Sequence, residues 1–364
     1  VLAVRVNQRK KPVQIPNHVE RIVGSVINTI GNKIRKVLAK LSIGATEWYK
    51  IFGPQKGWLI LLVTILYLVS GYQKHDIFFG GEQNVLNEFY ADYNGKLDKK
   101  ALARIDEMAL ETKKSEDSYA KATEDYAAGK ISSVEMDNAT WVHDSTTTMR
   151  GTYAMLQTEV ERLENLKQKR NIEPWLVNGV GYSLMLGERG FPRQFRRAML
   201  EVFILILVLS AIFSQERSFG TKIKIRTTKK GRLYFFQKKI GVIVVYSLLM
   251  NILIWGYEWL YYSKNFPLHN LRAPIQSIAV LESIPINCSI AGFFALLFLA
   301  RWMLIIAVGN VISFLSTRFT QVGTLSIATI LFLGPAALSL LGISVLEKIS
   351  VITPIAMIDR KSVV

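Results

Sequence analysis

Long runs of apolar residues constrain what this chain can fold into more than any other feature of its sequence. A helix that crosses the apolar core of a bilayer needs about 20 largely apolar residues. A soluble core could bury one such run, but several together predict helices that span a membrane. We therefore expect an all-α membrane protein with five transmembrane helices, at residues 58–72, 197–213, 240–262, 290–315 and 322–346.

The composition supports a membrane protein and excludes several other classes. The mean hydropathy is +0.23 although the net charge is +17, an unusual pairing for a soluble chain. Cys288 is the only cysteine, which excludes a disulfide framework and a cysteine-rich zinc site. The four histidines are scattered and form no metal-binding pattern, so we expect no metal.

The distribution of basic residues predicts the orientation, because cytoplasmic loops are enriched in Lys and Arg. Residues 1–57 contain 11 basic and 2 acidic residues, and residues 214–239 contain 9 and 1. Residues 74–195 contain 16 basic and 20 acidic residues. We expect the first two segments in the cytoplasm and the third outside the cell membrane, and alternation of the spans requires the same arrangement.

The chain divides into parts of different character. Residues 1–45 predict a cytoplasmic basic amphipathic linker, which could lie on the inner leaflet or pack on a neighbouring subunit. An interfacial elbow helix is expected next, ended by Gly53 and Pro54 and seated in the membrane by Trp48, Tyr49 and Trp58. The predicted boundaries are 1–45 for the linker, 46–57 for the elbow, 58–73 for the first span, 74–195 for an extracytoplasmic helical insert and 196–364 for spans two to five.

The insert has the pattern of a helical hairpin. Apolar and small residues recur at alternating spacings of four and three in each arm, which predicts two seams that pack on each other. Asp98 and Ser132 are placed as N-caps of the two arms, and Ser132 with Glu135 predicts a capping box. The predicted seams are Ala101, Ile105, Met108, Thr112, Ser115, Tyr119, Ala122 and Tyr126 in the first arm, and Val142, Met149, Tyr153, Leu156, Val160 and Leu163 in the second.

The chain lacks the motifs of a nucleotide-binding protein or a hydrolase. No Gly-rich phosphate-binding loop is present, and the adjacent His143, Asp144 and Ser145 would point in different directions on a helix. The basic residues sort by side of the membrane and do not form a nucleic-acid-binding stripe. The remaining candidates are three charges inside predicted spans, which either pair to fix helix register or line a substrate path: Glu201, Glu258 and Arg301.

The segment between the second and third spans is the most specific feature. Residues 214–239 read SQERSFGTKIKIRTTKKGRLYFFQKK, with an acid at the membrane exit and a lysine at the start of the next span. With the order of the parts around it, the chain resembles the permease subunits of ABC transporters, in the type-two exporter class. The residues that carry the resemblance are Glu216, Gly220, Thr221, Gly231, Arg232 and Lys239.

The resemblance implies a transport subunit without catalysis or cofactor of its own. A short cytoplasmic helix would dock in a groove of a separate ATPase subunit, which binds the ATP, and would pass its closure to the spans. A second permease half would complete the translocation path, either as a second copy or as part of a longer chain. The residues implied in coupling are Glu216, Phe219, Gly220, Thr221, Arg226, Lys229, Lys230, Gly231 and Arg232.

Other interpretations remain at this point. The segment could be an ordinary basic cytoplasmic loop, and the protein could be a sensor or scaffold whose hairpin binds a ligand or protein. Capture of a membrane-active peptide for immunity is a third function. The family has a sixth span that this chain lacks, so we expect a piece of a longer protein. Peptide or lipid-like cargo is suggested only by analogy with permeases that carry large outer inserts.

Overall fold

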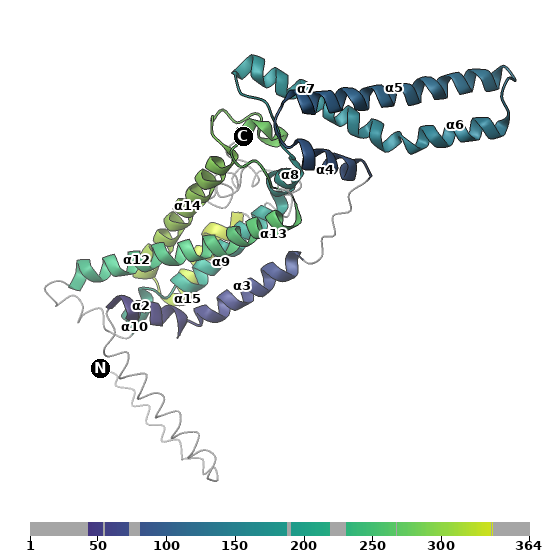
Figure 1. The fold of residues 1–364 in the computed structure, drawn as a ribbon. Coiled ribbons are helices and arrows are strands. Elements are labelled where there is room, and N and C mark those ends of the chain that lie inside the picture. Colours follow the sequence, from purple (N-terminus) through teal and green to yellow (C-terminus); the bar gives the residue numbers. More distant parts are fainter. Residues whose placement is uncertain are drawn as a thin grey trace, which may run out of the picture.

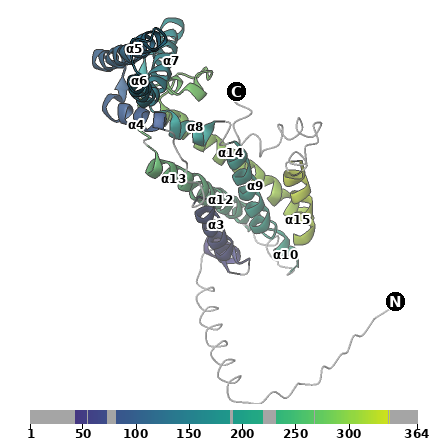
Figure 2. The same ribbon diagram turned by 90° about the vertical axis from the view of Figure 1, so that its right-hand side faces the viewer.

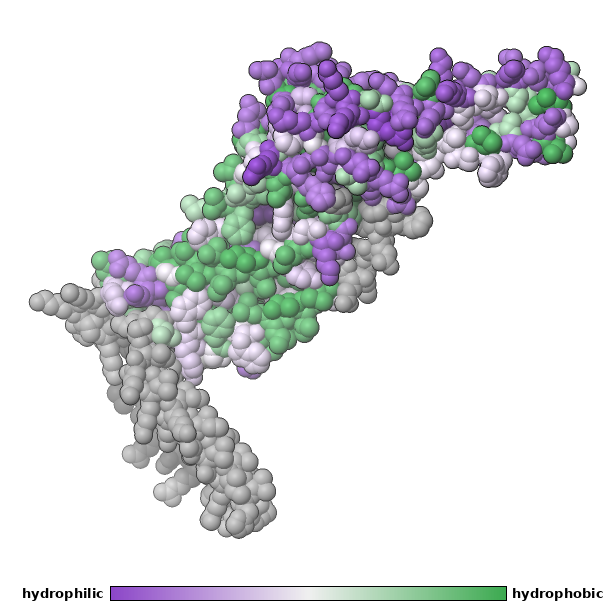
Figure 3. Space-filling view, viewed as in Figure 1, coloured by the Kyte–Doolittle hydropathy of each residue, from purple (hydrophilic) through white to green (hydrophobic). Residues whose placement is uncertain are grey.

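The computed structural model describes residues 43–53, 55–72, 81–187, 191–218, 231–266, 268–335 and 337. These residues are mostly helical, and they form a bundle of apolar helices with a long hairpin projecting from one end (Figure 1). The hydropathy of the surface also differs between the two parts: apolar residues cover much of the bundle, and hydrophilic residues cover much of the hairpin (Figure 3). The predicted linker lies almost entirely outside the described residues.

Three helices are long and apolar enough to cross a membrane: Arg193–Glu216, Leu233–Asn265 and Ile290–Arg318. They correspond to the second, third and fourth predicted spans, which are confirmed as membrane-length helices. A fourth crossing is possible by length and composition if the bent pair Ala45–Phe52 and Gly57–Gly71 counts as one span. The fifth run is described only over the shorter apolar helix Gln321–Leu333, so the full count of five stays a prediction.

The elbow is a bend of 57° between α2 (Ile43–Phe52) and α3 (Gly57–Tyr72). The backbone N–H of Gly53 donates to the carbonyl of Tyr49 at 2.8 Å, and Lys56 has a left-handed φ of 53° before α3 begins. The predicted end of the helix before the first apolar run is therefore confirmed. Tyr49 and Trp58 are exposed, whereas Trp48 is half-buried and stacks on Phe52, and the seating of the three in a membrane is still a prediction.

The bundle is built around α9 (Phe191–Leu209), which is followed by the short α10 (Ser214–Ser218). The third span consists of α12 (Gly231–Asn251), the π-helical turn η1 (Ile252–Gly256) and α13 (Tyr257–Asn265). The fourth is α14 (Ile290–Arg318), followed by α15 (Gln321–Ala328) and η4 (Thr329–Leu333). The core between them is apolar and includes Val202, Leu205, Ile206, Leu209, Ile243 and Ile312.

The outer helices of the bundle present large apolar side chains on their surfaces. The apolar window of the second span is 67% buried, whereas that of the fourth is only 22% buried. Contiguous exposed apolar surface is unfavourable in water and suits contact with lipid or protein. The residues that form it include Leu62 and Leu66 on α3, Phe236 and Leu249 on α12, and Leu296, Met303 and Phe314 on α14.

The hairpin is formed by α5 (Lys99–Ala127), α6 (Ser133–Ser145) and α7 (Thr147–Arg170). A helix that we did not anticipate, α4 (Gly81–Tyr93), packs on α7 at its base. There, β1 (Gly95–Lys96) pairs antiparallel with β2 (Trp175–Leu176), and the chain continues into α8 (Val180–Leu186). Two short 3₁₀ turns, η2 (Ile275–Ser277) and η3 (Ala279–Leu281), lie between α13 and α14.

Both predicted helix starts are confirmed. The Asp98 carboxylate accepts a hydrogen bond from the backbone N–H of Ala101 at 2.9 Å. Ser132 and Glu135 make the reciprocal bonds of a capping box, and the hydrogen bonds from Ser132 hold the pKa of Glu135 below its usual value. Each cap involves residues three positions apart, so the local sequence alone contains the required information.

The predicted seam of the hairpin is wrong at its outer end. Tyr126 and Val142 are about half exposed, at 48% and 49%. The second arm is two helices that meet at Thr146, and this break ends the continuous helical phase that a long seam requires. The outer contacts are polar or aromatic instead, such as the Tyr119 ring stacked on His143 at 4.1 Å between centroids. The buried seam residues lie nearer the base and are Ala101, Ile105, Met108, Thr112, Leu156 and Leu163.

Candidate functional site

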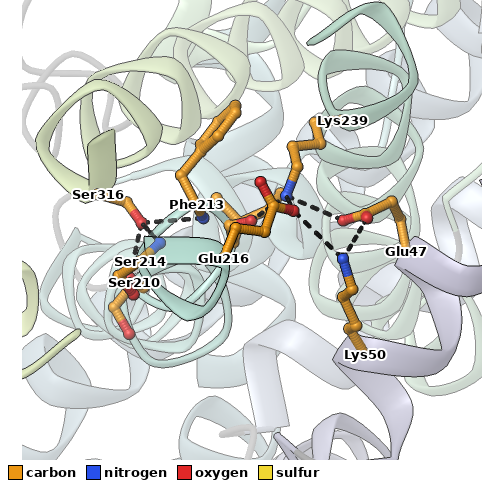
Figure 4. Close-up of polar contacts among 9 residues, drawn as sticks. Glu47, Lys50, Ser210, Phe213, Ser214, Glu216, Lys239 and Ser316 are labelled. Carbon is orange, nitrogen blue, oxygen red and sulfur yellow. Dashed lines mark hydrogen bonds and ion pairs between the residues drawn. The ribbon is translucent and has the colours of Figure 1, made fainter. Parts of the chain in front are cut away.

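Four charged side chains from three helices meet at the end of the bundle that is remote from the hairpin. Glu47 and Lys50 come from α2, Glu216 from α10 and Lys239 from α12 (Figure 4). We refer to these four residues as the charge cluster. It brings together the elbow helix and the helices on both sides of residues 219–230.

Each lysine of the charge cluster contacts both acids. Lys239 Nζ lies 2.5 Å from Glu216 Oε1 and 3.1 Å from Glu47 Oε2. Lys50 Nζ lies 2.5 Å from Glu47 Oε1 and 3.2 Å from Glu216 Oε1. The two positive and two negative formal charges cancel within the cluster, and the charges alternate in a closed ring.

The charge cluster is largely shielded from solvent. The side chains of Lys239 and Glu47 are 0% and 2% exposed, and that of Glu216 is 10% exposed. Burying a charge is costly unless it is paired and hydrogen-bonded. Lys239 meets this requirement fully, because it also donates to the carbonyl of Ile212 and lies over the rings of Phe213 and Phe235, at 4.6 and 4.8 Å from their centroids.

A serine on α14 fixes the break between α9 and α10, next to the charge cluster. The chain leaves α9 at Leu209 and re-enters helix at Ser214. The backbone N–H groups of Phe213 and Ser214 donate to Ser316 Oγ at 3.1 and 3.0 Å (Figure 4). Ser316 Oγ itself donates to the carbonyl of Ser210 at 2.9 Å. The fourth span is thereby bonded to the same region as the charge cluster.

The structure places only part of the predicted coupling segment. Glu216 is buried within the bundle, where its carboxylate forms ion pairs with Lys50 and Lys239. Gly231 and Arg232 form the first backbone turn of α12. The other residues predicted in coupling, Phe219, Gly220, Thr221, Arg226, Lys229 and Lys230, lie outside the described residues.

The sequence analysis missed two members of the cluster, Glu47 and Lys50. A signal was present, because Glu47 is the only acid in residues 46–57 and lies three residues before Lys50. An acid there requires a cationic partner, and Lys239 at the start of the third apolar run is a suitable one. The pattern alone does not say which of the many lysines is the partner.

The three charges predicted inside spans, Glu201, Glu258 and Arg301, have buried polar partners. Arg197, which we did not single out, forms an ion pair with Glu258. The Trp255 indole N–H, on the π-helical turn η1, donates to Glu201 at 3.2 Å. The Cζ atom of Arg301 lies 3.5 Å from the centroid of the Trp255 ring, and the Arg301 guanidinium donates to Gln194 Oε1. These contacts favour a role in fixing helix register, although Arg301 and Glu258 also line a cavity of about 250 Å³.

No group of three or more His, Cys, Asp or Glu side chains is placed to hold a metal ion within the part of the chain that the structure describes. Comparison of the chain with protein-family models, curated proteins and solved structures gives no match. The function is therefore argued from the residues and their geometry.

Proposed function

We propose that this chain is the permease subunit of an ATP-driven ABC-type exporter and passes motion from a separate ATPase subunit to its own membrane helices. In this proposal the ATPase docks on residues 219–230. ATP is bound and hydrolysed on that partner, and a second permease half contributes to the translocation path. The N-terminal part of the chain and the docking segment lie in the cytoplasm, and the hairpin lies outside.

The observation that carries the proposal is the charge cluster, because it joins the two flanks of residues 219–230. Glu216 precedes this segment and Lys239 follows it, and their side chains are 2.5 Å apart. Separating them would leave charges buried without partners, which is strongly unfavourable. The two helices that flank the segment are therefore held together, and a push on the segment moves them as a unit.

Through the same contacts, a displacement of the docking segment is transmitted to several helices. Glu47 and Lys50 connect the cluster to the elbow and through it to α3, while Lys239 belongs to the third span. The Ser316 hydrogen bonds add the fourth span. A docking site held in this way transmits displacement, as the coupling of an ATPase to a permease requires.

The charge of the segment fits an acidic partner surface. Residues 219–230 contain five basic and no acidic residues. A positive segment steers and orients a negatively charged partner groove during association. An ordinary basic loop would have the same charge, but it would not require its two flanks to be fixed by a buried ring of ion pairs.

Affinity purification of the full-length product in mild detergent tests the proposal. We expect an ATPase subunit to co-purify, and we expect it to be lost when Arg226, Lys229 and Lys230 are each replaced by Glu. The matched control replaces Lys113, Lys114 and Lys121 by Glu, because these lysines are exposed on the hairpin helix α5. Absence of an ATPase from the parent preparation would contradict the proposal and favour a sensor or scaffold.

A further inference from the structure

A second cavity, of about 700 Å³, lies where the hairpin meets the bundle. Helix α4 packs on α7, and α8 lies beside α4 in both ribbon views (Figures 1 and 2). We call this space the junction cavity. Its size is in the range of pockets that bind small organic molecules or a few residues of a peptide. The walls include Leu86, Tyr90, Glu159, Gly179, Ser277 and Val280.

The walls of the junction cavity are bonded to each other, so the cavity is preformed. Arg162 on α7 donates to the carbonyls of Gln276 and Ser277 at 2.9 and 2.8 Å. Its guanidinium also pairs with Glu159 at 2.6 Å and with Glu282 at 3.3 Å. Burial works to lower the pKa of Arg162, but the hydrogen bonds and charges of these two acids raise it above its ordinary value. The Arg162 guanidinium that holds these walls together is therefore positively charged at every physiological pH.

One polar group in the wall of the junction cavity lacks a partner. Ser277 is only 1% exposed, and its hydroxyl makes no hydrogen bond in the described structure. Arg162 donates to the carbonyl of the same residue, so the backbone at Ser277 is fixed on the wall of the cavity.

The charges around the cavity select the kind of ligand. Glu159 is the only charged residue among the described cavity walls, and most of the other walls are aliphatic or small. The insert that carries the cavity, residues 74–195, has 20 acidic and 16 basic residues, although the whole chain has a net charge of +17. This local negative charge attracts cations and disfavours anionic headgroups.

We propose that the junction cavity binds an apolar segment of a cationic amphipathic peptide, with the peptide's apolar side chains against Leu86 and Val280. The basic residues of the peptide face the acidic hairpin. The proposal concerns binding alone and does not depend on the ATPase partnership.

The test uses the purified full-length chain in phosphatidylcholine nanodiscs, with empty nanodiscs as background. The probe is a fluorescein-labelled peptide of Leu and Lys residues, and a second probe has Glu in place of every Lys. Fluorescence anisotropy should show saturable binding of the Lys peptide and at least tenfold weaker binding of the Glu peptide. Equal binding of the two probes, or binding no stronger than to empty nanodiscs, would overturn the proposal.

A cavity-filling variant locates the binding. A Cβ atom on Gly179 would meet no atom closer than 4.0 Å, and φ at this residue is −78°, so a side chain can be attached here without a clash at Cβ, and Gly179→Leu adds volume at the wall of the cavity. The matched control is Gly95→Leu, on β1 outside the cavity and also in open space. We expect at least tenfold weaker binding for Gly179→Leu and parent affinity for Gly95→Leu. Unchanged affinity in both would show that the peptide binds elsewhere.

A second pair of variants tests the charge and keeps the proposal testable if Gly179→Leu does not fold. Glu159→Gln removes the negative charge of the wall but keeps an oxygen that can accept from Arg162. Glu164→Gln is the control, because Glu164 is exposed on the same helix. Severalfold weaker binding is expected only for Glu159→Gln. Equal affinity in the two variants would contradict the role assigned to the cavity.

Discussion

Lys238 and Lys239 are neighbours on α12, yet their ammonium groups lie in opposite surroundings. Lys238 is exposed, with its Nζ 5.2 Å from the centroid of the Tyr234 ring. Lys239 is fully buried between two carboxylates. A buried charge depends on its partners, whereas an exposed one is solvated by water. The two residues therefore form a matched pair for testing the charge cluster.

Lys239→Met should destabilise the protein strongly, because it leaves Glu47 and Glu216 buried with only Lys50 to neutralise them. Removal of one partner of a buried ion pair typically costs about 3–5 kcal/mol. Lys238→Met should change stability by less than about 1 kcal/mol, as expected of an exposed charge. Thermal unfolding of the two variants in the same detergent checks this, and equal transition temperatures would show that the cluster does not support the fold.

At the scale of elements, the break between α9 and α10 depends on a side chain from another helix. Ser316 supplies the acceptor for two backbone N–H groups that the interrupted helix leaves unpaired. Ser313 lies nearly one turn earlier on α14 and is also buried, but its hydroxyl has no hydrogen-bond partner in the described structure. The two serines thus differ in the bonds they make and not in their burial.

Ser316→Ala should lower the free energy of unfolding by about 1–3 kcal/mol, the usual cost of leaving buried donors unpaired. Ser313→Ala should be neutral or stabilising, since it removes a hydroxyl that is buried without a partner. Amide hydrogen exchange in a peptide covering residues 207–218 provides a local measurement. Exchange should accelerate in Ser316→Ala alone, and acceleration of similar size in both variants would refute the assigned role.

Elements whose signals are local could be predicted from the sequence, and those that depend on distant contacts could not. The caps at Asp98 and Ser132 were predictable because each bonds a residue three positions away. The prediction of a buried seam as far as Tyr126 was wrong, because a helix break at Thr146 ends the periodic pattern. No Gly or Pro marks this break in the sequence. The charge cluster could not be assembled, because Lys50 and Glu216 are 166 residues apart and only tertiary packing brings them together.

On the scale of the whole molecule, three polar features follow one another between α10 at one end of the bundle and the hairpin at the other, two ends that Figure 2 shows. The charge cluster lies at the end of the bundle remote from the hairpin. The buried contacts of Arg197, Glu201, Glu258 and Arg301 lie inside the membrane-length helices. The junction cavity and the hairpin lie at the other end. This order puts the flanks of residues 219–230 at one end of the apolar region and the junction cavity at the other, which is the arrangement that the proposed exporter function requires.

Site-specific photo-crosslinking in intact membranes tests the central claim most directly. A benzoylphenylalanine at Thr228, inside the docking segment, should capture a protein that mass spectrometry identifies as an ATPase with a phosphate-binding loop. The same amino acid at Lys121, exposed on α5, should capture none. Capture of the ATPase from Thr228 alone would support docking of an ATPase on residues 219–230. Crosslinks from Thr228 that never contain an ATPase, or equal capture from Lys121, would contradict it.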